Sequence, residues 1–401
     1  MEEWLADHVL GLNGQAAQEQ VQAALNYSAF TSGTTHNFYH YPARFSPEFA
    51  RAIIAEFSKP GDLVLDPFMG GGTSIIEGLT LGRIMLGVDL NALAHFVAAT
   101  RTTPLSPQDE ERIISWADSA SFSLSLPNLA PTKSPGVRNL PQPVRTFVAG
   151  ALDMASTLPL RRQQNFARCA LLRLGQWALD CRDFSAPRRR RLGRQLPSLA
   201  RSLLAGLQQF VEKCRLSGVT KSQITGHRLL LNRSVVGLHE EARLRPFMGR
   251  VNLVLTSPPY PRVHVLYHRW QYLGRKETPA PYWIANVPDG SGEAFYTFGS
   301  RKSSNMDRYF TTLKEAFISI CPLLAHDALV VQLVAFSDAE IQLPRYLSAM
   351  EDAGYQEAFL STEGSRLSRL VPNRKWYAKL REQSDTASEI LLIHRVRPWI
   401  K

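Results

Sequence analysis

Short apolar runs alternate along the chain with segments in which apolar residues recur at helical spacing. Runs bounded by glycine, proline or charged residues predict buried strands. The predicted strands are 63–65, 84–88, 228–231, 251–255, 328–336, 356–361 and 389–396. Helical spacing between them predicts, among others, helices at 74–81, 307–320 and 344–353. Strands and helices that alternate in this way predict a doubly wound α/β fold.

Two stretches interrupt this alternation. Residues 1–35 show helical spacing without strands, which predicts an N-terminal helical extension. Residues 105–227 are an insertion. Its first part, up to Pro143, is rich in proline and serine, as linkers are, and the remainder is largely helical in pattern. Residues 36–104 and 228–401 are therefore predicted to be the two halves of one α/β domain.

A glycine-rich turn follows the first predicted strand, in the run Asp66-Pro67-Phe68-Met69-Gly70-Gly71-Gly72-Thr73. A helix and a second strand come next, and Asp89 closes that strand, which completes a βαβ unit. Glycines let the backbone approach a ligand closely, and an acid after the second strand is the expected partner of a ribose. Asp66 would repel a dinucleotide pyrophosphate but could accept a hydrogen bond from an ammonium group. The pattern favours a nucleoside-type cofactor with an amino acid end over NAD or FAD.

A second motif, Thr256-Ser257-Pro258-Pro259-Tyr260, closes the predicted strand at 251–255. Consecutive prolines fix φ, remove two backbone donors and hold the preceding residue extended. Rigid hydrogen-bond acceptors beside the ring of Tyr260 suit a planar base that carries an exocyclic NH2 group. The alternative is an ordinary proline-rich loop after a strand.

An aromatic loop precedes the first strand, at residues 35–47. It holds Phe38 and Tyr41, and Ser46 with Pro47 predicts the start of a helix. Such a loop is expected either to fill the edge of the core or to form the wall of an adenine pocket.

Together, Asp66-Pro67-Phe68-x-Gly70-x-Gly72-Thr73 and the Thr256–Tyr260 motif resemble the S-adenosylmethionine-dependent DNA methyltransferases that act on exocyclic amino groups. The aromatic loop resembles the N-terminal cofactor motif of that family. The resemblance covers about 36–104 and 228–396, and it implies a Rossmann-like class I methyltransferase domain with a mixed seven-stranded sheet. In this chain the family's S-adenosylmethionine-binding positions correspond to Phe38, Tyr41, Pro42, Asp66, Pro67, Phe68, Gly70, Gly72, Thr73, Asp89 and Leu90. The family's base-holding positions correspond to Ser257, Pro258, Pro259 and Tyr260.

Basic charge is concentrated in the insertion. The chain carries a formal charge of +11. Residues 138–228 contain 15 Arg and 2 Lys against 3 Asp and 1 Glu, which gives 17 − 4 = +13, so the rest of the chain sums to −2. The run Arg188-Arg189-Arg190-Arg191 is a predicted phosphate contact with double-stranded DNA, and a solvated helical face is the alternative.

Aromatic and basic residues also mix in two loops after the Ser-Pro-Pro-Tyr motif. Residues 261–304 include the predicted DNA contacts Arg262, His264 and Arg269, and a later loop includes Arg374. Such residues suit stacking on, or replacement of, a base that leaves the duplex. A hydrophobic lid is the alternative for the first loop, and a turn with a surface cation–π pair is the alternative for the second.

The predicted chemistry is methyl transfer to an exocyclic amine, with base flipping. Ser257 Oγ and the Pro258 carbonyl can accept the two amine protons and stabilise the positive charge that develops on nitrogen. Methylation at cytosine C5 needs a cysteine nucleophile, and Cys321-Pro322 stands in the wrong order and place for one. By resemblance, serine at the start of the turn favours N4 of cytosine, whereas aspartate or asparagine is commoner for N6 of adenine.

Other features limit the context. Four cysteines without a C-x-x-C pair predict neither a metal site nor disulfides, and they fit a reducing cytoplasm. No apolar run is long enough to span a membrane. A cognate restriction endonuclease is a possible partner, and the sequence does not specify an oligomeric state. The rival functions are N6-adenine methylation, methylation of an RNA base, and DNA binding without catalysis.

Overall fold

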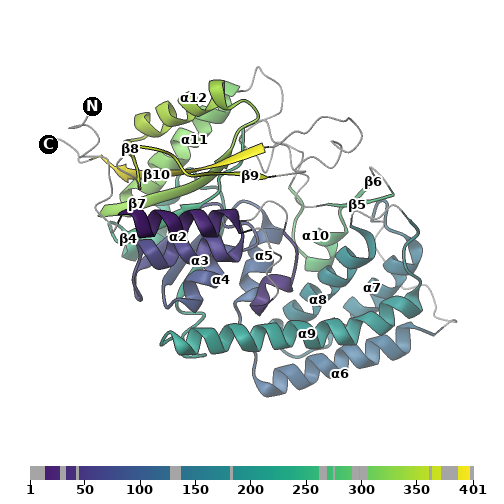
Figure 1. Cartoon of the computed structure of the whole chain (residues 1–401). Helices are drawn as coiled ribbons and strands as arrows, with labels where there is room; N and C mark the ends of the chain where they lie inside the picture. Colours follow the sequence, from purple (N-terminus) through teal and green to yellow (C-terminus); the bar gives the residue numbers. More distant parts are fainter. Residues whose placement is uncertain are drawn as a thin grey trace.

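A mixed eight-stranded sheet forms the centre of the molecule (Figure 1). The computed structural model describes residues 14–27, 33–41, 45–126, 137–180, 184–261, 269–273, 276–290, 298, 306–360, 364–371 and 387–397. Seven strands follow the order β3-β2-β1-β4-β7-β10-β8, and β9 pairs with β10. They are β1 (Leu63–Asp66), β2 (Ile84–Asp89), β3 (Arg228–Asn232), β4 (Val251–Thr256), β7 (Leu324–Ala335), β8 (Tyr355–Ala358), β9 (Ser368–Val371) and β10 (Ala387–Val396). β10 runs antiparallel to its neighbours and the other pairs are parallel, which confirms the predicted α/β class.

Helices cover both faces of the sheet. Along β1 and β4, Val64 and Leu253 belong to one hydrophobic core, whereas the adjacent Leu65 and Val254 belong to the other. The first core is covered by α2 (Gly14–Asn26), α3 (Pro47–Phe57), α4 (Thr73–Thr80) and α5 (Ala92–Arg101). The second is covered by α11 (Met306–Ile320) and α12 (Ala339–Asp352), which lie across the sheet from α2 and α3 (Figure 1).

Local signals place the helices next to the glycine-rich turn. Ser46 Oγ accepts a hydrogen bond from the Phe49 amide at 3.1 Å, and Pro47 occupies the first turn of α3, as predicted. Asn91 caps α5 in the same way, accepting from the Leu93 amide at 2.9 Å. These caps fix where the chain leaves the loops that surround the site.

The insertion is more helical than its composition predicts. Its helices are α6 (Pro107–Leu124), α7 (Gln142–Ser156), α8 (Arg161–Leu179) and α9 (Arg189–Leu216). The linker predicted before Pro143 was wrong for α6, because Ser106 and Asp109 form a capping box that starts this helix within a proline- and serine-rich stretch. All four helices share the core of α2 to α5. At Gly206 of α9, a Cβ atom would lie 2.2 Å from the Thr34 carbonyl oxygen, so the insertion packs directly on the helix η1 (Thr34–Asn37).

The strand count was also wrong by one. The resemblance implied seven strands, and β9 is an eighth, pairing with the first part of β10. β9 is an edge strand whose Leu370 is 70% exposed, so it lacks the buried apolar run by which strands are predicted. A small hairpin of β5 (Trp270–Tyr272) and β6 (Lys276–Thr278) and the short helix α10 (Ala280–Ala285) occupy part of the loop predicted at residues 261–304. Within the described residues, no helix is both long and apolar enough to cross a membrane.

Candidate active site

The glycine-rich turn and the Ser-Pro-Pro-Tyr turn meet at one edge of the sheet. β1 is paired in parallel with β2 on one side and with β4 on the other, so the carboxyl ends of all three strands lie together. Asp66, Asp89 and Thr256 are the last residues of these strands. In open α/β sheets this edge is where ligands bind.

Asp66 joins the two turns directly. One carboxylate oxygen accepts from Thr256 Oγ1 at 2.8 Å and from the Phe68 amide at 3.1 Å. The other oxygen accepts from Ser74 Oγ in the first turn of α4. Burial raises the pKa of Asp66 to about 6, against the effect of these hydrogen bonds. Two motifs that are 190 residues apart are therefore held together by a carboxylate that is only 1% exposed.

Asp89 fixes the other side of the glycine-rich turn. Its carboxylate accepts from the Gly70 amide at 2.8 Å and from the Asn91 amide at 2.7 Å. Desolvation raises its pKa to about 6. Asn232, the last residue of β3, donates to the backbone carbonyls of Asp89 and Leu90. Asn232 thus holds the end of β2 in place.

The backbone of the turn needs glycine. Gly70 and Gly72 have φ values of +49° and +80°, in the left-handed region. A Cβ atom on Gly71 would lie 2.8 Å from Tyr41 Cβ, so the aromatic loop packs against the turn. The Tyr41 hydroxyl accepts from Asn91 Nδ2 at 3.2 Å. The aromatic loop is therefore in direct contact with the glycine-rich turn.

Two groups at this edge have the character of a ligand site. Thr73 Oγ1 is buried, and it has no hydrogen-bond partner within the part of the chain that the structure describes. Buried hydroxyls are normally paired. Leu90, directly after Asp89, is an apolar side chain that is 37% exposed.

Other predicted cofactor residues lie differently. Phe38 is fully buried and makes an edge-to-face contact with Phe166 of α8, with ring centroids 5.5 Å apart, so its ring fills the core. Pro67 is buried in the turn, whereas Phe68 is half-buried with its ring 5.5 Å from that of Phe298. Pro42 lies outside the described residues.

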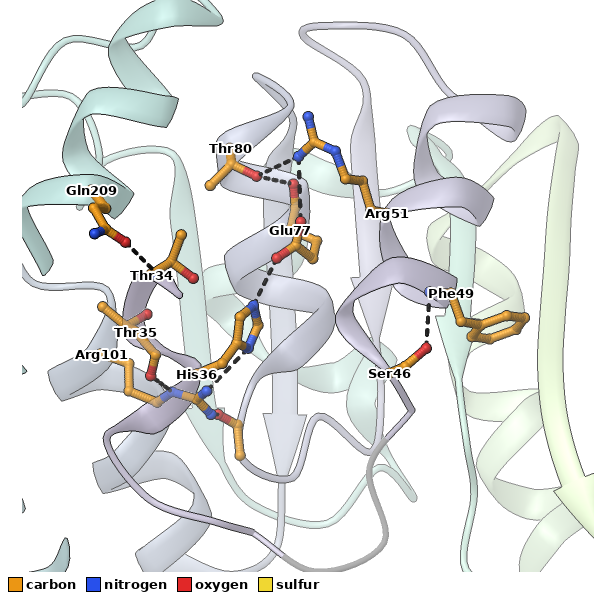
Figure 2. A network of polar contacts seen from close by, with 11 residues as sticks. Thr34, Thr35, His36, Ser46, Phe49, Arg51, Glu77, Thr80, Arg101 and Gln209 are labelled. Atoms are coloured by element: carbon orange, nitrogen blue, oxygen red, sulfur yellow. Dashed lines mark hydrogen bonds and ion pairs between the residues drawn. The ribbon is translucent and has the colours of Figure 1, made fainter. Parts of the chain in front are cut away.

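A buried polar cluster that the sequence did not reveal supports the turn from behind (Figure 2). The guanidinium of Arg101, which is completely buried, donates to the Gly71 carbonyl, to the Thr35 carbonyl at 2.8 Å and to His36 Nδ1 at 3.2 Å. His36 Nε2 lies 2.7 Å from Glu77 of α4. Since arginine only donates, His36 Nδ1 must accept, which places the imidazole proton on Nε2, toward Glu77. The imidazole is therefore neutral, and it links Arg101 to the carboxylate.

The Ser-Pro-Pro-Tyr turn follows β4 and is closed by its own side chains. Ser257 Oγ donates to the Tyr260 hydroxyl at 2.9 Å, and Tyr260 donates to Glu389 of β10 at 3.2 Å. Tyr309 of α11 donates to the Pro259 carbonyl at 2.7 Å. The sequence predicted that the Tyr260 ring lies beside the acceptors as a face for a planar base, but Tyr260 is only 7% exposed. Its hydroxyl points into the protein because it donates to the buried carboxylate of Glu389.

The arginine run lies at the start of α9. Arg188 is the N-cap residue, and Arg188, Arg190 and Arg191 are exposed. The guanidinium of Arg191 lies 5.5 Å from the ring centroid of Trp177, a cation–π contact. Some arginines elsewhere in the insertion have internal partners, as in the ion pair of Arg162 with Asp109 at 2.7 Å. The start of α9 is where several exposed arginines lie side by side.

The described part of the chain does not bring the other predicted nucleic-acid contacts together on one surface, because only Arg269 lies within it. Arg269 forms ion pairs with Asp289 at 3.0 Å and with Glu277 at 3.8 Å, so its charge is used within the protein. The predicted contacts Arg262, His264 and Arg374 lie outside the described residues. Among those described, no group of three or more His, Cys, Asp or Glu could hold a metal ion.

Residues 14–99 match the family model of the DNA methylases. This segment is similar to the DNA methylases. The chain is 40% identical over 88 residues to the type II methyltransferase M.MvaI of Kocuria varians, covering 21% of this chain and 19% of that protein. It is 35% identical over 72 residues to the type II methyltransferase M.BsoBI of Geobacillus stearothermophilus, covering 18% and 14%. The chain thus matches less than a fifth of each relative's length.

The methylase segment contains the aromatic loop, the glycine-rich turn and Asp89, and it confirms the predicted resemblance for this half of the site. The Ser-Pro-Pro-Tyr turn lies beyond the matched residues. Among solved structures, the rRNA methyltransferase aviRa from Streptomyces viridochromogenes covers 93% of this chain and 92% of its own. With 9% identity and a TM-score of 0.29, that likeness is too weak to carry a conclusion.

Proposed function

We propose that this protein is an S-adenosylmethionine-dependent DNA methyltransferase that methylates the exocyclic N4 of cytosine. The observation that carries the proposal is the hydrogen bond between Thr256 and Asp66, which holds an acceptor-rich turn against a methylase glycine-rich turn. One turn suits the cofactor and the other suits the amine, so methyl donor and acceptor would meet between them. The relatives that the chain matches over part of its length are type II methyltransferases, which supports DNA as substrate.

The residues at the sheet edge fit the proposed cofactor. Asp89 offers carboxylate oxygens to ribose hydroxyls, and Leu90 beside it offers an apolar surface to a purine ring. The unpaired hydroxyl of Thr73 lies at the start of α4, where backbone N–H groups favour a carboxylate. A carboxylate has about four acceptor sites. Asp66 accepts three hydrogen bonds from within the protein, so about one acceptor site remains for an ammonium donor. When bound, S-adenosylmethionine supplies a methyl group on a sulfonium.

The acceptor side is built from the turn itself. Ser257 Oγ and the Pro258 carbonyl would accept the N–H groups of the target amine, whose lone pair is otherwise delocalised into the base. Hydrogen bonds from both N–H groups to these acceptors favour a pyramidal nitrogen and stabilise the positive charge that develops on it during attack. The target atom lies inside a duplex, so the base must leave the stack to reach the turn. Serine at this position is the reason to prefer cytosine N4 over adenine N6.

The test uses labelled S-adenosylmethionine, purified protein and duplex DNA of mixed sequence, followed by mass spectrometry of the digested nucleosides. We expect N4-methylcytosine. N6-methyladenine would retain the mechanism and change the target base. Label in RNA but not in DNA would overturn the proposed substrate, and calorimetry that detects no cofactor binding would favour a non-catalytic DNA-binding protein.

Cofactor affinity is expected to depend on pH through Asp66 and Asp89. Both have a pKa raised to about 6, so they are ionised above that pH and become protonated below it. Ammonium and hydroxyl donors bind the ionised form, so affinity is expected to fall as the pH drops through about 6. Calorimetric titration from about pH 5 to about pH 8 measures this. In Asp89→Asn the dependence is expected to be shallower, and a constant affinity in the wild type would contradict the assignment.

DNA binding is expected to use the arginines at the start of α9. Positive charges at a helix N-terminus are disfavoured by the helix dipole. A bound phosphate would offset this cost, because it interacts favourably both with the arginines and with the N-terminus of the helix. Replacing Arg188 and Arg190 by alanine is expected to weaken binding and to lower the slope of log K against log salt by about 2. Fluorescence anisotropy over a salt series measures it. Arg215→Ala, at the other end of the same helix and paired with Glu212, is the matched control. An unchanged slope in the double variant would leave the run as a solvated face.

A further inference from the structure

A chain of hydrogen bonds runs from the Ser-Pro-Pro-Tyr turn to the edge of the sheet. Beyond Tyr260, the second carboxylate oxygen of Glu389 accepts from Arg369 Nε at 2.7 Å and lies 2.5 Å from its Nη2. Arg369 Nη1 then donates to the Leu25 carbonyl in α2 at 2.9 Å. Glu389 is 4% exposed. These hydrogen bonds thus connect the turn, strands β9 and β10, and helix α2.

The polarity of this chain is set at its buried end. Arginine only donates, and a carboxylate only accepts. Glu389 therefore takes the proton of the Tyr260 hydroxyl, and the Tyr260 oxygen takes that of Ser257. Because the Ser257 hydroxyl donates its proton to Tyr260, its oxygen can only accept a hydrogen bond from another group.

We propose that Glu389 and Arg369 are positioning residues that hold Ser257 as a hydrogen-bond acceptor for the target amine. The inference rests on the proposed function, because an amine offers N–H groups and a serine proton pointing outward would oppose them. Without the carboxylate, the Tyr260 and Ser257 hydroxyls could reverse. Ser257 would then present its proton to the incoming NH2 group for part of the time.

The eighth strand explains how the pair is placed. In the pairing of β9 with β10, Arg369 lies directly opposite Glu389. Glu389 in turn lies opposite Ala335 at the end of β7, the strand beside β4. β9 thus brings a cation to the buried carboxylate that accepts from Tyr260. The extra strand therefore has a role at the site that the sequence pattern did not reveal.

The first test is kinetic and uses nearly isosteric replacements. Glu389→Gln is expected to lower kcat about tenfold, with cofactor affinity unchanged. Glu357→Gln is the control, because Glu357 of β8 also pairs with an arginine, Arg366, at 2.6 and 2.8 Å, but in a more exposed position. In the Ser257→Ala background Glu389→Gln is expected to cost nothing more, since it acts through Ser257. Losses that multiply in the double variant would overturn the proposal and indicate a general structural role.

The second test does not depend on activity. The Cζ carbon of Tyr260 is observed by NMR in protein with 13C-labelled tyrosine, and the resonance is assigned by its loss in Tyr260→Phe. It is expected to shift in Glu389→Gln and to stay in place in Glu357→Gln. If the Tyr260 resonance does not shift in Glu389→Gln, the proposed hydrogen-bond chain is contradicted, even in a protein without methyltransferase activity. A wild type that methylates nothing, with the NMR shift present, would instead contradict the proposed function alone.

Discussion

Replacing Ser257 by alanine is expected to lower turnover about a hundredfold while leaving the affinity for S-adenosylmethionine unchanged. The substitution removes one of the two proposed acceptors that stabilise the charge developing on the target nitrogen, and the loss of one such preorganised group typically costs about 10²-fold in kcat. Cofactor affinity is expected to persist because the turn around Gly70 is held by Asp89, and Asp66 retains its hydrogen bond from Thr256.

Single-turnover methylation of duplex DNA measures the rate, and calorimetry measures cofactor affinity. Ser234→Ala is a suitable control, because Ser234 follows β3 at the same edge of the sheet and its hydroxyl accepts only from the local amide of Val236 among the described contacts. A full rate in Ser257→Ala would show that the base-holding role has been assigned to the wrong residue. A parallel loss of cofactor affinity would place Ser257 on the cofactor side.

The parts of the site that follow strands could be predicted from the sequence, because strand, turn and terminal acid are adjacent in the chain. Asp66, the glycines and Asp89 are of this kind, and the structure places them at one sheet edge. The bond between Thr256 and Asp66 is a consequence of β1 and β4 being neighbours, which the strand order of a doubly wound sheet provides.

Side-chain direction could not be predicted, because it depends on partners distant in sequence. Tyr260 turns inward because Glu389, 129 residues later, accepts its proton. Phe38 packs in the core because the insertion supplies Phe166 as its neighbour. Arg269 was counted as a phosphate contact, yet two acids of the same hairpin region use its charge. In each case a residue was assigned from its type, and its contacts in the folded protein decided where it lies; for Tyr260 and Phe38 these contacts are distant in sequence.

Replacing Arg101 by methionine is expected to lower the free energy of unfolding by about 3 kcal/mol, since breaking a buried charged network leaves its partners without compensation. The guanidinium is completely buried, and its loss would remove the arginine donor from the Gly71 carbonyl, from the Nδ1 atom of His36 and from the Thr35 carbonyl, which would keep only the hydrogen bond from the Phe38 amide. Each such group costs about 1–3 kcal/mol when buried without a partner.

Urea unfolding measures the effect, and Arg201→Met is the matched control. Arg201 also forms an ion pair, with Asp118 at 2.7 Å, but both side chains are 48% exposed, so a much smaller change is expected. Because Arg101 holds the Gly71 carbonyl, the folded variant is also expected to bind S-adenosylmethionine more weakly than wild type. Equal losses of stability in the two variants would mean that the buried cluster contributes no more than a surface pair. Unchanged cofactor affinity in Arg101→Met would separate the cluster from the glycine-rich turn and leave it a purely structural role between η1 and α4.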